Sequence, residues 1–211
     1  MSDIEPLAVH VVDDDEAVRA SLQFLLESAG LTVCTHASAE AFLACAGQAA
    51  VGCVLTDVRM PGLGGLELQE RLHTAGHTFP VIVMSGHGDV PTAVRALKDG
   101  ALDFLEKPFD DDQLLAAIRK ALSAGAAARA AAAAAAAAAH RLAALTPRER
   151  EVLAGLVAGQ GSKAIALDLG TSPRTVEVHR TRVMAKLQVR SLPELVRLVA
   201  AAQAAAAPQD A

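Results

Sequence analysis

The stretch VVDDDE, residues 11–16, runs two valines directly into four carboxylates. Its two valines end the first of five short apolar runs in the first 124 residues. The runs are 7–12, 31–35, 51–56, 80–84 and 101–105. Segments with helical spacing of apolar residues alternate with them, one face of the fourth segment being Val90, Val94 and Leu97. Because near-continuous apolar strands are typical of parallel sheets covered on both faces, the pattern predicts an α/β, doubly wound, five-stranded parallel sheet.

The charge of the chain is unevenly distributed. Residues 1–124 carry 8 Lys+Arg and 18 Asp+Glu, whereas residues 125–211 carry 11 and 6. An acidic half suggests a cationic partner, and a basic half suggests a polyanion. The three cysteines have no metal-ligand spacing and predict no disulfide framework. The first ten residues lack the basic start of a secretory signal, so we expect a cytoplasmic protein without a membrane segment.

A polyalanine stretch marks the domain boundary. Residues 126–139 are alanine except for Arg129. Alanine favours helix, but the stretch has no larger apolar side chain to bury, so we expect residues 124–142 to form a linker, helical or frayed. It separates a domain at 5–123 from an all-α domain at 143–205. A helix of the second domain is expected to begin with Thr146 as its N-cap, Pro147 at its first position and Glu149 three residues after the cap.

Polar residues gather at the predicted carboxyl ends of the strands. Asp13 and Asp14 follow the first strand, and Asp57 ends the third. A solvated acidic turn would explain residues 11–16 alone, but carboxylates from two neighbouring strands suit Mg²⁺, which prefers oxygen ligands. Ser85 and Lys107 follow the fourth and fifth strands, and a hydroxyl and an ammonium suit the oxygens of a phosphoryl group. Asp57 is therefore a candidate phosphoryl acceptor that would form an acyl phosphate.

Four motifs in order, VVDDDE, LTDVRMPGLGG, VMSGHGD and DFLEKPF, resemble the flavodoxin-like receiver domain of two-component response regulators. The resemblance covers residues 5–123 and makes Asp57 the phosphoacceptor. It implies Mg²⁺ ligands at Asp13, Asp14, Asp57 and the backbone carbonyl of Arg59. It also implies phosphate-binding or switch roles for Ser85, Phe104 and Lys107. A strand phenylalanine is more often a core residue, and that alternative for Phe104 stays open.

The basic half contains a helix-turn-helix pattern. A short amphipathic helix at 163–169 is followed by a glycine-containing turn and by a second helix that Ser172 would cap, with Pro173 at its first position. On this second helix apolar residues recur at core spacing, while basic residues occupy the other face. No aromatic residue follows Phe109, which argues against recognition of RNA or single strands by base stacking.

LTPREREVL, SKAIA, SPRTVEVH and MAKL resemble the LuxR-type four-helix DNA-binding domain, and the whole chain resembles the FixJ/NarL group, on the FixJ side. The resemblance places base contacts on Glu177, Val178 and Thr181. It places DNA-phosphate contacts on Lys163, Arg174, Thr175, Arg180, Arg182 and Lys186. Glutamate can accept a hydrogen bond from cytosine and valine can contact a thymine methyl group. Ser162 departs from the asparagine that is usual in the family.

These resemblances imply a transcriptional regulator that a sensor histidine kinase phosphorylates on Asp57. It would dimerise through about residues 90–104 and bind double-stranded promoter DNA, with RNA polymerase as a further candidate partner. We expect no enzyme activity beyond the receiver's own phosphoryl transfer and dephosphorylation. A DNA-binding regulator independent of phosphorylation is the alternative. An aspartyl-phosphate phosphohydrolase is disfavoured because Arg59 stands where a second acid would be needed.

Overall fold

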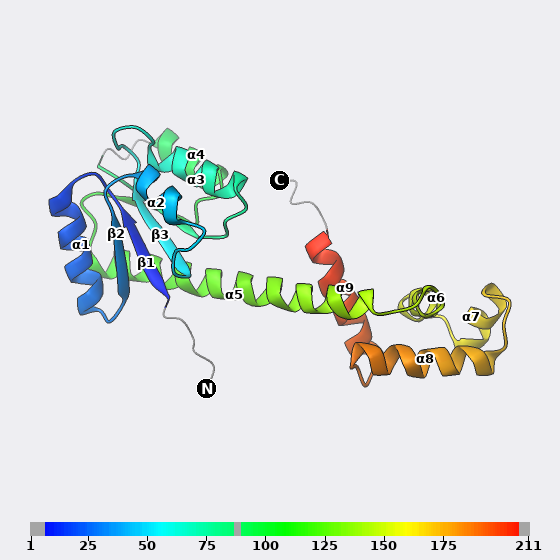
Figure 1. The fold of residues 1–211 in the computed structure, drawn as a ribbon. Coiled ribbons are helices and arrows are strands. Elements are labelled where there is room, and N and C mark those ends of the chain that lie inside the picture. The colour runs from blue at the N-terminus through cyan, green and yellow to red at the C-terminus, as the bar shows by residue number, and fades with distance from the viewer. Residues whose placement is uncertain (1–6, 87–89, 207–211) are drawn as a thin grey trace. The chain divides into compact units, whose positions relative to one another are not determined.

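The computed structural model describes residues 7–86 and 90–206. The chain divides into two compact units, residues 1–129 and 130–211. In the first unit five parallel strands form one sheet in the order β2-β1-β3-β4-β5, which confirms the predicted doubly wound fold. Strands β2, β1 and β3 are labelled side by side in Figure 1. The strands are β1 (Ala8–Val12), β2 (Thr32–His36), β3 (Gly52–Asp57), β4 (Val81–Ser85) and β5 (Asp103–Glu106).

Helices cover both faces of this sheet (Figure 1). They are α1 (Glu16–Ser28), α2 (Ala39–Cys45), α3 (Gly65–Thr74), α4 (Val90–Lys98) and α5 (Asp111–Ala143). Helices α1 and α5 pack on one face, where Leu26 and Ile118 meet alternate strand residues such as Leu55. Helices α2, α3 and α4 pack on the other, where Phe42 lies against Val54. Alternation of side chains along each strand therefore supplies two separate cores.

The expectation of burial on both faces is correct for the three central strands only. Every residue of β1 and β4 is buried, whereas the edge strand β2 exposes Thr32 and Thr35, and β5 exposes Glu106. An edge strand has a neighbour on one side only, so less of its surface is covered.

The apolar face of α4 lies outside the core. Val90, Val94 and Leu97 share one face of the helix, as the spacing predicts, but are 73%, 44% and 49% exposed. The residue of α4 that enters the core is Ala96, which is fully buried. A large apolar surface of α4 is thus exposed to solvent.

Helix α5 continues without a break through the polyalanine stretch. Its first part belongs to the sheet core through Leu114, Ile118 and Leu122. Within the stretch itself Ala135 and Ala138 are buried, although the absence of large side chains predicts no core role there. In the described part of the chain, α5 is also the one helix long and apolar enough to cross a membrane by length and composition.

The second unit is all-helical: α6 (Pro147–Val157), α7 (Ser162–Asp168), α8 (Pro173–Leu187) and α9 (Leu192–Ala206) surround one core. Two predicted helix starts are confirmed. Thr146 forms a capping box with Glu149, and the hydroxyl of Ser172 accepts a hydrogen bond from the amide of Thr175. Each cap pairs an amide that has no partner within its helix, so the sequence signal defines where α6 and α8 begin.

Candidate functional site

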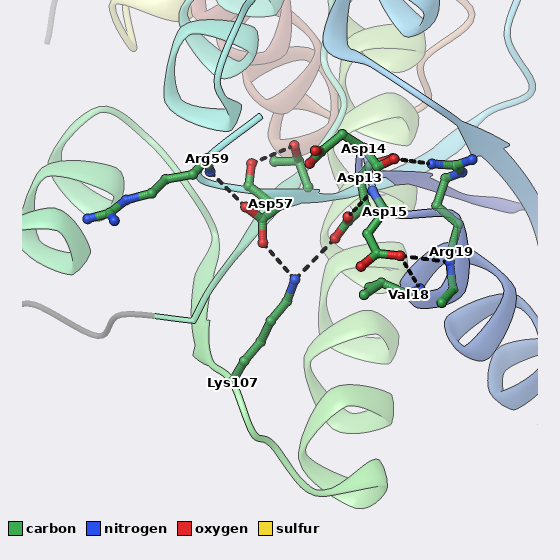
Figure 2. Close-up of polar contacts among 10 residues, drawn as sticks. Asp13, Asp14, Asp15, Val18, Arg19, Asp57, Arg59 and Lys107 are labelled. Carbon is green, nitrogen blue, oxygen red and sulfur yellow. Dashed lines mark hydrogen bonds and ion pairs between the residues drawn. The ribbon is translucent and has the colours of Figure 1, made fainter. Parts of the chain in front are cut away.

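The predicted phosphorylation site lies at one rim of the sheet. Asp57 and Ser85 are the last residues of β3 and β4, while Asp13 directly follows β1 and Lys107 directly follows β5. Since β1, β3, β4 and β5 are parallel neighbours, their carboxyl ends bring these four residues to the same edge. Figure 2 shows Asp13, Asp57 and Lys107 together there. Ligand sites of doubly wound sheets occur at this edge, where the strand order reverses.

The ammonium group of Lys107 bridges two carboxylates (Figure 2). Its Nζ lies 2.6 Å from Oδ1 of Asp57 and 3.1 Å from Oδ2 of Asp13. The Asp13 side chain is 3% exposed and that of Asp57 is 14% exposed. Burial of Lys107 lowers its pKa, but the hydrogen bonds to Asp57 and Asp13 outweigh this effect and leave the pKa above its ordinary value. Lys107 is therefore positively charged at this site at neutral pH.

The backbone also holds Asp57. The amide of Arg59 donates a hydrogen bond of 2.7 Å to Oδ2 of Asp57 (Figure 2). Gly65, the first residue of α3, packs so closely that a Cβ atom there would lie 2.2 Å from the carbonyl oxygen of Asp57. The carboxylate is thus oriented by one amide and one ammonium group, and the start of α3 packs closely against the end of β3.

Each aspartate of VVDDDE has its own surroundings, which explains how the cluster is tolerated. Asp13 accepts a hydrogen bond from the amide of Asp15, and Asp15 caps α1 by accepting from the amides of Ala17 and Val18. Arg19 donates to the backbone carbonyls of Asp13 and Asp14 at 2.8 and 2.9 Å. Sequence reasoning missed the roles of Asp15 and Arg19. The aspartate directly before a helical segment was the available signal for the cap.

The residues at the rim fit a divalent cation in their chemistry. Across residues 7–86 and 90–206, no group of three or more His, Cys, Asp or Glu side chains is arranged closely enough to hold a metal ion. Asp13 and Asp57 nevertheless already share one cation, the ammonium of Lys107. Oxygen ligands that converge on a single positive charge are the kind that Mg²⁺ takes. The side chain of Asp14 is exposed beside them.

The two predicted switch residues lie on neighbouring strands. Ser85 is 3% exposed, and its carbonyl oxygen accepts a 2.7 Å hydrogen bond from the amide of Lys107. Phe104 is partly buried and packs against the core under α2, α3 and α4. Ser85 is therefore connected to the site through the backbone of Lys107, and Phe104 borders the core on which α4 rests.

The predicted recognition helix α8 has one buried and one exposed face. Val176, Val183 and Leu187 are fully buried, as their spacing predicts. The three residues assigned to base contacts, Glu177, Val178 and Thr181, are exposed. Of the residues assigned to phosphate, Lys163, Arg174, Thr175 and Arg182 are exposed and Arg180 is partly exposed. The exposed face therefore carries both the base-reading candidates and most of the positive charge.

Lys186 is exposed like the other phosphate candidates, but it also has partners within the protein. Its Nζ lies 2.6 Å from the carboxylate of Glu149 and 3.4 Å from the carbonyl oxygen of Ala144. Glu149 is 3% exposed, and its hydrogen bonds to Lys186 and Thr146 lower its pKa to about 2. Lys186 thus joins α8 to α6 while its side chain stays 38% exposed, and its phosphate role remains a prediction.

A receiver with an acidic acceptor site, joined to a helix-turn-helix domain, defines a response regulator: a DNA-binding transcriptional regulator that a sensor kinase controls by phosphorylation. Residues 9–119 match the response regulator receiver domain, and residues 143–199 match the bacterial regulatory proteins of the luxR family. The chain belongs to the FixJ-like response regulators of two-component systems.

Similarity to known proteins extends over nearly the whole chain. The transcriptional regulatory protein FixJ of Azorhizobium caulinodans is 55% identical over 98% of this chain and 97% of the relative. The response regulator protein TmoT of Ectopseudomonas mendocina is 43% identical over 94% of this chain and 90% of the relative. Among solved structures, the response regulator StyR is 43% identical, with a TM-score of 0.81 over 92% of this chain and 98% of StyR. Full-length FixJ from B. japonicum is 50% identical, with a TM-score of 0.58 over 93% and 97%.

Proposed function

We propose that Asp57 is the phosphoryl acceptor and that its phosphorylation controls DNA binding by the second domain. The observation that carries this assignment is the Lys107 ammonium, which lies between Asp13 and Asp57 at the carboxyl end of β3. In the reaction a carboxylate oxygen of Asp57 attacks the phosphorus of a kinase phosphohistidine. The phosphorus–nitrogen bond breaks, the imidazole leaves, and an acyl phosphate forms. Lys107 then has new partners, the oxygens of the phosphoryl group.

Asp13, Asp14, Asp57 and the carbonyl of Arg59 are the proposed Mg²⁺ ligands. Receiver domains in general depend on Mg²⁺, and the all-oxygen composition of this rim agrees with that requirement. When bound, the ion offsets repulsion between the incoming phosphoryl group and the carboxylates. The two carboxylates that already share the charge of Lys107 are the strongest support for this set.

The proposed output of the receiver is a homodimer formed through residues 90–104. Phosphorylation can act at a distance only if it biases a segment with two arrangements. Ser85 and Phe104 lie on the strands next to α4 and are the proposed switch residues. Val90, Val94 and Leu97 expose an apolar surface on α4 that a second receiver could cover.

In the second domain we assign base contacts to Glu177, Val178 and Thr181. Phosphate contacts are assigned to Lys163, Arg174, Thr175, Arg180, Arg182 and Lys186. Exposure of these side chains on and beside α8 supports the assignment. We place the regulator in the cytoplasm, with promoter DNA as its target and RNA polymerase as a further partner. We assign it no enzyme activity beyond the receiver's own phosphoryl transfer and dephosphorylation.

DNA binding with and without acetyl phosphate and Mg²⁺ tests the proposal. The full-length protein, Asp57→Asn, and the control Glu27→Gln would be compared by mass spectrometry and by fluorescence anisotropy on promoter DNA. Glu27 is a suitable control because its carboxylate accepts a hydrogen bond from Gln23 on the exposed surface of α1, outside the site and residues 90–104. We expect a phosphoryl mass increase and tighter binding in the wild type and Glu27→Gln, and neither effect in Asp57→Asn. Equal binding under all conditions would instead indicate regulation independent of phosphorylation.

A further inference from the structure

The carboxylate of Glu177 is held from a neighbouring helix. Ser162, the first residue of α7, donates a hydrogen bond from its hydroxyl to Oε1 of Glu177 on α8. Nη1 of Arg180 lies 3.9 Å from the same oxygen. The Glu177 side chain is 55% exposed, so these contacts fix it at the surface of α8 and do not draw it into the core.

The two oxygens of this carboxylate have different surroundings. Both contacts are made to Oε1, and within the part of the chain that the structure describes no hydrogen bond or ion pair to Oε2 is found. A carboxylate fixed through one oxygen can accept a hydrogen bond through the other. In the major groove of DNA the donors available to it are the exocyclic amino groups of cytosine and adenine.

The hydroxyl of Ser162 is not needed to begin its own helix. Gly161 is the N-cap of α7, and its carbonyl accepts from the amides of Ala164 and Ile165. Among the described residues, Glu177 is the hydrogen-bond partner of the Ser162 side chain. The hydrogen bond therefore links the two helices of the helix-turn-helix at the residue assigned to base contact.

We propose that Ser162 is a positioning residue for DNA recognition: its hydroxyl orients Glu177 so that Oε2 meets an amino-bearing base, and so determines the base preference at that position. The inference rests on the proposed DNA contacts of α8. A glutamate that is already ordered loses less side-chain freedom on binding. That advantage corresponds to about a two- to tenfold stronger preference for the matching base pair.

Selection from a randomised DNA library tests this role. Full-length wild type, Ser162→Ala, Ser162→Thr and Glu177→Gln would each be treated with acetyl phosphate and Mg²⁺ and the bound DNA sequenced. We expect Ser162→Ala to weaken the preference about two- to tenfold at one base pair in each half-site. Glu177→Gln should alter the same base pair, and Ser162→Thr, which keeps the hydroxyl, should retain the wild-type preference. Alanine favours helix more than serine does, so α7 should remain folded, which circular dichroism would verify.

Three results would overturn the role of Ser162 while leaving DNA binding in place. They are an unchanged or sharper preference in Ser162→Ala, a loss spread evenly over all positions, and Ser162→Thr behaving as Ser162→Ala. A sharper preference would mean that the hydroxyl withholds Glu177 from DNA. If the wild type selects no sequence at all, the proposed DNA contacts fail together with this inference.

Discussion

Replacing Lys186 by methionine should weaken the DNA-binding domain, because this lysine pairs with Glu149 within the domain. Methionine keeps the length of the side chain but cannot neutralise Glu149, whose carboxylate lies 2.6 Å from Nζ of Lys186 and is 4% exposed. A pKa of about 2 in place of the ordinary 4.5 favours the ionised form in the folded domain by at most about 3 kcal/mol, and solvent screening at the 38% exposed Lys186 reduces this contribution. The hydrogen bond from Lys186 is the largest cause of this lowered pKa, and the backbone hydrogen bond from Thr146 is the next largest. We therefore expect Lys186→Met to lower the free energy of unfolding by about 2 kcal/mol at pH 7.

The pH dependence of this stabilisation has a definite sign. The folded pKa of Glu149 is lowered, so its contribution is fully present above about pH 4.5 and is lost as the pH falls towards 2. Lys186→Met should reduce that acid-sensitive contribution. Arg148→Met, which removes an exposed pair with Glu151 and a hydrogen bond to the carbonyl oxygen of Leu169, should change stability by about 1 kcal/mol and leave the acid-sensitive contribution of Glu149 in place.

Native-state hydrogen exchange on the full-length chain can measure the effect, because peptides from α6 and α8 report the second unit separately from the first. The salt dependence of DNA binding would be measured in parallel. Loss of a phosphate contact would reduce the slope of log affinity against log salt by about 1, whereas loss of an internal ion pair should leave it unchanged. Unaltered exchange protection together with a smaller slope would refute the structural role and leave Lys186 as a phosphate contact only.

Three further predictions concern the receiver. Val94→Asp should prevent dimerisation by phosphorylated protein, measured by light scattering, because it places a charge on the apolar face of α4. Burial, together with the nearby charge of His10, lowers the pKa of His36 to about 4. The contribution of neutral His36 to the free energy of unfolding of the receiver should therefore be lost as the pH falls from about 6.5 towards 4. His36→Leu should reduce that loss by about 1–2 kcal/mol in urea unfolding. Gly65→Ala should lower the receiver's melting temperature and its rate of phosphorylation by acetyl phosphate, because the new Cβ would meet the Asp57 carbonyl at 2.2 Å.

Each of these predictions has a control within the same fold. Val94→Ala keeps the α4 surface apolar and should still dimerise. His77→Leu changes a histidine that contacts Phe79 and, among the described residues, makes no contact with His10 or His36. The acid sensitivity of the receiver should therefore persist in this variant. Gly76→Ala changes a glycine at a positive φ with open space around it, so it should affect stability but not phosphorylation. A dimer of Val94→Asp, full acid sensitivity in His36→Leu, or normal phosphorylation of Gly65→Ala would contradict the corresponding argument.

Much of this fold was predictable because its signals are local. Strands and helices follow from the spacing of apolar residues within one segment, and the starts of α6 and α8 follow from Thr146 and Ser172, which act on amides three residues away. The convergence of Asp13, Asp57 and Lys107 was also predictable, since parallel strands must end at the same rim. The roles of these residues in phosphoryl transfer remain predictions.

The tertiary structure alone decided which faces are covered and which charges are paired. The apolar face of α4 and the basic character of Lys186 look the same in the sequence whether they meet solvent, DNA or another helix. Lys186 meets Glu149, 37 positions earlier, and Ser162 meets Glu177 across the turn between two helices. Such partners depend on how helices pack in three dimensions. Packing is set by the sum of many small contacts between segments, and the spacing of residues within one segment does not predict these contacts.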